Sequence, residues 1–200
     1  MNDWIYRDID LKAGETVIIA PATGSFGGAA VVLAIAMGAR VIAMGRNVEA
    51  LKSVAARSER IKIVPVTGDV QADAEALREF GPVDAFLDIS PPEAAKSTHI
   101  RSGILALRQS GRVSLMGGIR EDISIPYSVV MHRNLQLRGK WMYERKDIAA
   151  LIRMIEIGLL KLDESVGVKV VGKYALEEWD DAFTVAAENS GMGMLALIAP

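Results

Sequence analysis

A glycine-rich turn between an apolar strand and an apolar helix is the feature that most limits how this chain can fold. Thr16–Ala20 (TVIIA) is a continuous apolar run, which is typical of a strand buried on both faces. The next residues read Pro21-Ala22-Thr23-Gly24-Ser25-Phe26-Gly27-Gly28. Ser25–Met37 then has the pattern of a helix that ends at Gly38. The order strand, glycine turn, helix indicates a helix packed closely against a parallel sheet.

The same alternation of strand and helix continues along the chain. Four more strands are expected at 40–44, 61–66, 83–89 and 112–116, separated by helices at 48–58, 72–80 and roughly 91–109. This predicts an α/β fold of the Rossmann type, a doubly wound parallel sheet of about six strands with helices on both faces. A barrel of eight such units needs about 250 residues, more than the 200 available.

The regular alternation of strands and helices ends at Gly118. We expect helices at 126–132, 146–159 and 176–189, and strands at 134–142, 167–171 and 194–198. The prediction is one Rossmann domain over residues 1–200, with a leader segment at 1–14 and a C-terminal strand within 190–200.

Composition excludes several classes of function. Lys and Arg number 23 against 25 Asp and Glu, so the net charge of −2 gives no electrostatic case for binding nucleic acid or an acidic membrane. The absence of cysteine excludes disulfides, thiol nucleophiles and cysteine-containing zinc sites. The most apolar stretch, Phe26–Ala39, is shorter than the about 20 residues that span a bilayer, and the N-terminus has no signal-peptide pattern. A cytoplasmic location is therefore expected.

The glycine turn has the spacing of a dinucleotide fingerprint. Gly24 lets the backbone approach a pyrophosphate, and Gly27 lets the helix pack closely on the strand. The free N–H groups near Ser25 and Phe26 would face the phosphates, assisted by the helix dipole. The alternative is that these glycines only make a tight turn. Their place after the first strand and before a helix favours dinucleotide binding.

The end of the second strand predicts which dinucleotide binds. An NAD site usually has an acid about 20 residues beyond the glycines, but Gly45 stands 21 residues after Gly24 and is followed by Arg46 and Asn47. No carboxylate repels a 2′-phosphate there, and the planar guanidinium of Arg46 matches one. We therefore expect NADP(H), with NAD less favoured. The alternative is that Arg46 is a solvated turn residue.

These motifs together resemble the coenzyme domain of the medium-chain dehydrogenase/reductase superfamily, in particular its zinc-type alcohol dehydrogenase and quinone reductase branch. The resemblance is carried, in the expected order, by GETVIIAPATGSFGGAAVVLAIAMGARVIAMGRN, VDAFLDIS, GRVSLMGG, LQLRGKWMYERKDIAALIRMIEIGLL and MLALIAP. It implies an oxidoreductase that transfers hydride between a nicotinamide and an alcohol or carbonyl.

The resemblance also implies positions for the cofactor. The pyrophosphate would be held by Gly24, Ser25, Phe26 and Gly27, and the adenosine ribose by Gly45, Arg46 and Asn47. The remaining contacts implied are Asp69 near the adenine, Ile89 and Ser90 on the ribose side, Met116 and Gly117 near the nicotinamide, and Trp141 near its carboxamide.

The chain departs from the family in its catalytic groups. Family members have an N-terminal catalytic domain that carries the metal ligands and proton relay, whereas this chain begins at the coenzyme domain. It has no cysteine, and its only histidines, His99 and His132, are expected to be satisfied or solvated. We therefore expect no catalytic residue and no zinc in this chain, inactivity when it is isolated, and a missing catalytic domain as a partner.

Three other classes of protein give different expectations for this sequence. A non-catalytic NADP-binding sensor or regulatory subunit has a similar glycine turn and stays open. A methyltransferase on a similar sheet would need an acid at the end of the second strand, where this chain has Gly45. A short-chain dehydrogenase relay needs Tyr-x-x-x-Lys, and Tyr143 is one residue too close to Lys146.

Two surfaces are expected to be covered. The Phe26–Met37 helix is apolar nearly all round, so Val32 and Ile35 should contact something besides its own sheet. The 134–142 strand would lie at the edge of the sheet, and its pairing with a second copy predicts a homodimer. The alternative is that Arg138 and Lys140 block this edge.

Overall fold

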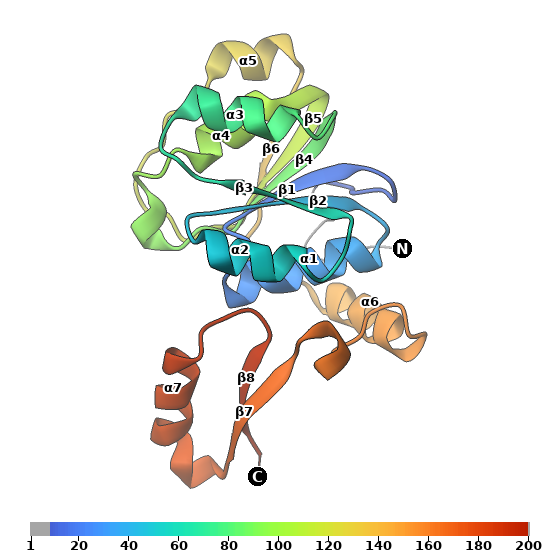
Figure 1. The fold of residues 1–200 in the computed structure, drawn as a ribbon, viewed down its shortest axis with the longest axis vertical. Helices are drawn as coiled ribbons and strands as arrows, with labels where there is room; N and C mark the ends of the chain where they lie inside the picture. Colours follow the sequence, from blue (N-terminus) through green and yellow to red (C-terminus); the bar gives the residue numbers. More distant parts are fainter. Residues whose placement is uncertain (1–8, 200) are drawn as a thin grey trace.

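The computed structural model describes residues 9–199 of the chain. Its main body is a six-stranded sheet in the order β3-β2-β1-β4-β5-β6 (Figure 1). Every neighbouring pair of strands runs parallel, which confirms the predicted doubly wound Rossmann fold. The strands are β1 (Thr16–Ala20), β2 (Arg40–Gly45), β3 (Ile61–Pro65), β4 (Val83–Asp88), β5 (Leu107–Leu115) and β6 (Gln136–Gly139).

Helices cover both faces of this sheet. On one face lie α1 (Ser25–Ala36) and α2 (Val48–Ala55), and on the other lie α3 (Val70–Arg78) and α4 (His99–Ala106) (Figure 1). Successive side chains of a strand point to opposite faces, so β1 divides its residues between two cores. Val17 and Ile19 belong to the core under α1, and Ile18 and Ala20 to the core under α4. This explains why β1 is apolar from Val17 to Ala20.

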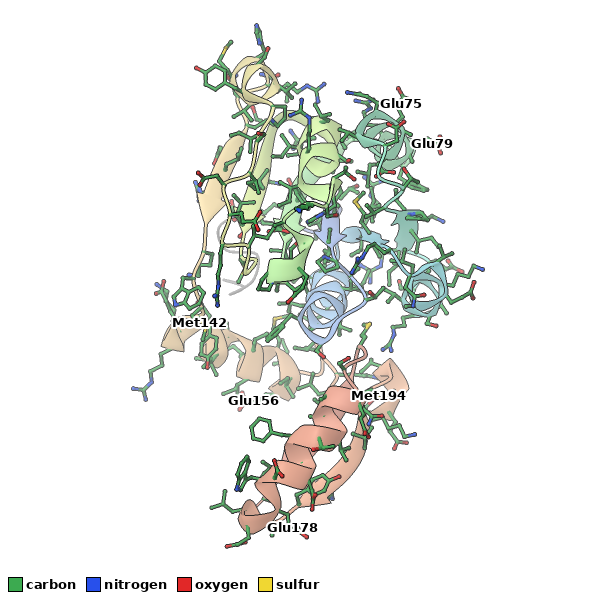
Figure 2. The ribbon with its side chains drawn as sticks, turned by 90° about the vertical axis from the view of Figure 1, so that its left-hand side faces the viewer. Glu75, Glu79, Met142, Glu156, Glu178 and Met194 are labelled. Carbon is green, nitrogen blue, oxygen red and sulfur yellow. The ribbon has the colours of Figure 1, made fainter. Side chains whose placement is uncertain are left out.

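The last part of the chain does not join the main sheet. β7 (Lys169–Tyr174) and β8 (Met194–Ile198) form a separate two-stranded parallel sheet, connected through α7 (Trp179–Glu188). We call residues 164–199 the C-terminal unit. In Figure 2, Met194 lies at the end of this unit nearer the main sheet and Glu178 at its far end. The predicted strand at 194–198 therefore forms, but it pairs with β7.

Helix α1 is covered by more than its own sheet. Met154 of α6 (Arg145–Glu156) belongs to the same apolar core, and Leu151 and Met192 pack against it. Val32 and Ile35 are half-buried, so these neighbours cover the outer side of α1 only in part.

The predicted helix over roughly 91–109 is wrong in extent. Only a short 3-10 turn forms at Pro92–Ala94, and α4 is confined to His99–Ala106. β5 begins at Leu107, which pairs with Val83, and the register shifts before Ala85 pairs with Arg112. Ser110 has a φ of 59° at this irregularity. Apolar spacing did not reveal that the chain turns into the sheet at Leu107.

The predicted strand over 134–142 is also too long, because β6 covers only Gln136–Gly139. Asn134 and Met142 have positive φ values of 50° and 58°, which end the extended backbone on both sides. A helix α5 (Tyr127–His132) precedes β6, close to the predicted 126–132.

Candidate functional site

The predicted site lies where the chain order of the sheet reverses, at the carboxyl ends of β1, β2, β4 and β5. Two cavities open there. One, of about 410 Å³, is lined by Arg46 and we call it the Arg46 cavity. The other, of about 430 Å³, is lined by Gly24–Gly27 and we call it the glycine-turn cavity. Pro21, Ser90 and Pro91 line both cavities, so these form one continuous candidate site.

The glycine turn leaves the start of α1 open to an anion. Gly24 is the N-cap residue in extended conformation, no side chain caps the helix, and its first turn has no acid. The first N–H groups of a helix have no acceptor within it, so those of Ser25, Phe26 and Gly27 face the turn. A Cβ on Gly27 would lie 1.9 Å from the carbonyl oxygen of Pro21. Only glycine allows this close approach of helix and turn.

The end of β2 presents a cation. Gly45 and Arg46 line the Arg46 cavity, and the guanidinium of Arg46 has no hydrogen-bond or ion-pair partner among residues 9–199. Asn47 is used differently, because its side chain accepts a hydrogen bond from the Ala50 N–H at 3.0 Å and caps α2. Of the three residues predicted to hold the adenosine ribose, two therefore face the cavity.

Two other predicted contacts lie apart from the cavities. The carboxylate of Asp69 caps α3 by accepting hydrogen bonds from Gln71 and Ala72 at 2.9 and 3.0 Å. Its neighbours Thr67 and Gly68 line the Arg46 cavity, whereas Asp69 does not. Trp141 is 85% exposed beyond β6 and lines neither cavity.

The loops after β4 and β5 close the site on the other side. Ile89, predicted on the ribose side of the cofactor, and Met116, predicted near the nicotinamide, both line the glycine-turn cavity. Gly117 is tightly enclosed, since a Cβ there would lie 2.7 Å from Asp88 Oδ2 and 2.9 Å from the Ser90 backbone. The Gly118 N–H donates to the Ser90 carbonyl at 2.7 Å. These contacts hold the two loops together.

A buried polar cluster lies behind these loops, and the sequence did not predict its contacts. The Ser90 hydroxyl donates to Asp88 Oδ1 and lies 2.6 Å from His99 Nε2. His99 Nε2 is also 3.1 Å from Asp88 Oδ1, and its Nδ1 is 2.8 Å from the Ser97 hydroxyl. Because Ser90 is only 2% exposed, its side chain supports the loop from inside and leaves its backbone to face the cavities. The sequence signal was Asp88, an acid at the end of β4 directly after the apolar residues Ala85–Leu87.

This cluster is not arranged for nucleophilic catalysis. In a serine-histidine-aspartate triad the serine and the carboxylate meet opposite nitrogens of the imidazole. Here Ser90 and Asp88 both meet Nε2, and Ser97 meets Nδ1. Burial of Ser90 also keeps a substrate from its hydroxyl. The cluster instead fixes the backbone between β4 and α4.

The C-terminal unit touches the glycine turn. The Ser25 hydroxyl donates to the Ser190 carbonyl at 3.1 Å, and Gly24 and Gly191 form an antiparallel bridge. A Cβ on Gly28 would lie 2.2 Å from the Met192 side chain, so α1 and this segment are in close contact. Residues 190–192 therefore form one wall of the turn.

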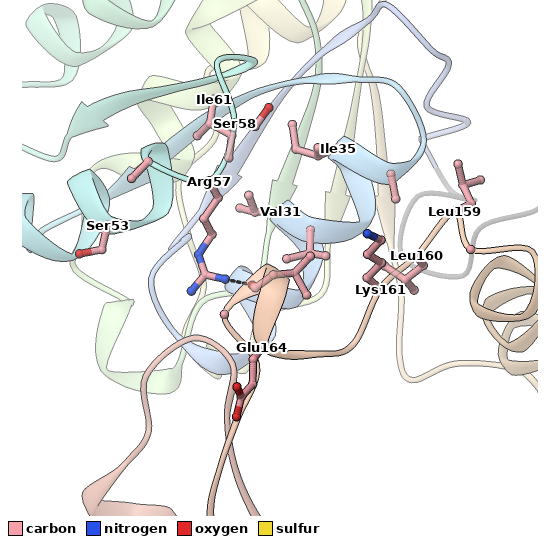
Figure 3. Close-up of a pocket in the computed structure, with 16 residues that line it drawn as sticks. Val31, Ile35, Ser53, Arg57, Ser58, Ile61, Leu159, Leu160, Lys161 and Glu164 are labelled. Carbon is pink, nitrogen blue, oxygen red and sulfur yellow. Dashed lines mark hydrogen bonds between the residues drawn. The ribbon is translucent and has the colours of Figure 1, made fainter.

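A further cavity, of about 620 Å³, lies between α1, α2 and the segment leading to β7 (Figure 3). Val31 and Ile35 form part of its apolar side, and Arg57 donates to the Val166 carbonyl across it. Its lining includes the C-terminal half of α1 and the first residue of β3. It is thus remote from the carboxyl ends of the strands.

The described part of the chain supplies no metal centre. Within residues 9–199, no three His, Asp or Glu side chains gather as metal ligands, and the sequence contains no cysteine. These residues do not fit a zinc ion. None of the helices described is long and apolar enough to cross a membrane.

Fold and site together define a Rossmann domain of the dinucleotide-binding class. Residues 26–156 match the family model for zinc-binding dehydrogenases. The chain belongs to this family, which confirms the resemblance inferred from the sequence motifs.

The relatives found are oxidoreductases about twice as long as this chain. "Probable D-xylulose reductase A" of Arthroderma otae is 25% identical over 196 residues, which cover 98% of this chain and 53% of that protein. The 2R,3R-butanediol dehydrogenase of Bacillus subtilis superposes with a TM-score of 0.72 at 19% identity, over 98% of this chain and 54% of the other. The quinone oxidoreductase of Thermus thermophilus, also solved with NADPH, gives 0.65 at 23% identity, over 94% and 59%. The chain thus spans about half the length of these relatives.

Proposed function

We propose that this chain binds NADP(H) and forms the coenzyme half of an alcohol-dehydrogenase-like oxidoreductase. The observation that carries the preference for NADP(H) is the unpartnered guanidinium of Arg46 beside Gly45, where a carboxylate would otherwise select NAD. In the complete enzyme the bound nicotinamide would exchange hydride with an alcohol or carbonyl. The open start of α1 would hold the pyrophosphate, and Ile89 and Met116 would orient the nicotinamide.

Replacing Arg46 by alanine tests the cofactor assignment. A charge-assisted contact to a phosphate contributes about 1.5–3 kcal/mol, so the wild-type chain should bind NADPH at least about tenfold more tightly than NADH. Arg46→Ala should remove most of this preference, measured as two dissociation constants by calorimetry. Arg40→Ala is the matched control, because Arg40 is exposed at the opposite end of the same strand. Equal wild-type affinities for the two cofactors would refute the assignment.

The second candidate is a non-catalytic NADP-binding sensor or regulatory subunit. Its support is the same open glycine turn and Arg46 cavity, since binding alone needs no catalytic group. The coenzyme-half proposal predicts that the isolated chain is inactive and that a catalytic half restores NADPH-dependent reduction of a carbonyl. Full function without such a half would favour the sensor.

We also infer that a catalytic half covers the C-terminal unit. A two-stranded sheet is marginally stable alone in water, and this one leaves apolar side chains exposed on β7, β8 and the segment between them. They are Val170, Leu176, Trp179, Phe183, Met194, Leu195, Leu197 and Ile198. The twofold greater length of the relatives supplies enough chain to cover them.

A homodimer through β6 is the remaining proposal about partners. Among the strands of residues 9–199, β6 pairs in the main sheet with β5 alone, so within this part of the chain its other side is an open edge. The Lys140 N–H donates to the Leu115 carbonyl at 3.0 Å, and Leu115 is the register partner of Gly139. The peptide N–H of Gly139 therefore points to the open edge, where it can pair with a second copy across a two-fold axis.

A further inference from the structure

The wall of the Arg46 cavity opposite β2 carries a second cation. Lys96 lies in the turn between the short 3-10 turn Pro92–Ala94 and α4, and lines the same cavity as Arg46. Its ammonium group is exposed and has no hydrogen-bond or ion-pair partner within the described residues. Glu93 is the acidic side chain on this wall. The cavity is thus lined by two cations, Arg46 and Lys96, for which the described residues supply no partner.

We propose that Lys96 is a specificity-determining residue that binds the 2′-phosphate of NADP(H) together with Arg46. This inference rests on the proposed function. A phosphate monoester carries about −1.5 to −2 charge at neutral pH, which the single charge of Arg46 does not balance. Lys96 supplies the second positive charge on a flexible four-carbon stem with rotatable donors. It also offsets Glu93, which would otherwise repel the phosphate.

The buried cluster described above fixes the place of Lys96. The Ser97 hydroxyl lies 2.8 Å from His99 Nδ1, and His99 Nε2 lies 2.6 Å from the Ser90 hydroxyl. This chain of contacts ties the residue after Lys96 to the end of β4. The Ser97 N–H also donates to the Ala94 carbonyl at 2.9 Å. His99, only 3% exposed, is therefore a positioning residue that holds the backbone carrying Lys96 beside the cavity.

The test compares ligands with and without the 2′-phosphate. NADPH, NADH, 2′,5′-ADP and 5′-AMP are titrated by calorimetry into the wild-type chain, Lys96→Ala, Arg46→Ala and the double variant. Lys96→Ala should weaken NADPH and 2′,5′-ADP by about three- to tenfold and leave NADH and 5′-AMP within twofold. The loss should shrink as salt is added, because an exposed charge pair is screened.

Lys62→Ala is the matched control. Lys62 is exposed on β3, lies outside the Arg46 cavity and has no partner within the described residues. Its removal changes the net charge equally and should leave all four dissociation constants unchanged. If Lys96→Ala behaves like Lys62→Ala, or weakens NADPH and NADH equally, the inference is wrong.

Different results would contradict the proposed function and the proposed role of Lys96. A wild-type chain that binds NADPH and NADH equally overturns the proposed function. A preference for NADPH that Arg46→Ala removes and Lys96→Ala leaves intact keeps the proposed function and overturns the role of Lys96.

Variants of His99 test its positioning role. His99→Leu should lower the NADPH/NADH affinity ratio toward that of Lys96→Ala, and His99→Gln, which retains a donor, should restore part of it. In the Lys96→Ala background His99→Leu should not lower the ratio further. A merely structural role would reduce the affinities for both cofactors and leave the ratio unchanged, which would contradict the positioning role.

Discussion

Two strands of similar sequence have opposite surroundings in this molecule. β1 (TVIIA) is buried at every position in the main sheet, whereas β8 (MLALI) in the C-terminal unit has four exposed positions and one half-buried. The main sheet encloses its apolar residues between two helical layers, whereas β8 pairs with β7 and packs beside α7. The main sheet therefore forms a complete hydrophobic core. The C-terminal unit has the apolar residues of a core, but no second layer covers them in the described part of the chain.

Matched substitutions of phenylalanine should separate the two regions most clearly. Phe86 of β4 is 0% exposed and Phe183 of α7 is 65% exposed. Phe86→Ala leaves a cavity in the core and should lower the free energy of unfolding by about 3–5 kcal/mol. Phe183→Ala should lower it by less than about 0.5 kcal/mol, as surface substitutions do. Urea denaturation of the two variants measures both, and equal losses would show that Phe183 is buried in solution.

Fluorescence of an environment-sensitive dye, which reports exposed apolar surface, should distinguish the two regions by an effect of intermediate size. If the exposed residues of the C-terminal unit form one apolar surface, the isolated chain should bind the dye strongly. Replacing Leu176 and Phe183 together by serine should remove about half of the fluorescence. Tyr127→Ser is the control, since Tyr127 is 75% exposed on α5 away from that unit. A signal that falls equally in both variants would contradict the proposed covering of the C-terminal unit.

A substitution at the free edge of the main sheet should have the smallest effect on the free energy of unfolding. Gly139→Pro removes an N–H that faces the open edge, so it should leave the unfolding free energy nearly unchanged and abolish pairing with a second copy. Sedimentation should show the wild type at twice the 21.5 kDa chain mass and the variant at that mass. Arg138→Pro should also weaken β5–β6 pairing, because its N–H lies on the β5 side. A monomeric wild type would contradict the dimer.

The order of elements around the site could be predicted because local signals are strong there. The apolar run of β1, the glycines of the turn and the asparagine cap of α2 each act within a few residues. The cluster of Asp88, Ser90 and His99 could not be predicted, because its hydrogen bonds depend on how the loop after β4 folds back. Leu107 was misassigned to a helix for a similar reason, since its pairing with Val83 is a contact between strands.

Some of the predicted site residues line the cavities, and others use their side chains elsewhere. Gly24, Arg46 and Met116 line the cavities because they follow strands whose carboxyl ends share one edge. Asn47 and Asp69 also follow strands, but each caps the next helix with its side chain. Residue type alone does not separate a helix cap from a ligand contact, because both uses need a short polar side chain at a helix start.

The ribosome makes the glycine turn well before it makes the segment that touches this turn. Ser25 must wait for the carbonyl of Ser190, 165 residues further along the chain. At about 5–20 residues per second, synthesis of that stretch takes roughly ten to thirty seconds. During this time the main sheet can assemble while the start of α1 lacks its C-terminal wall. The completed turn therefore exists only after residues 190–192 have been synthesised.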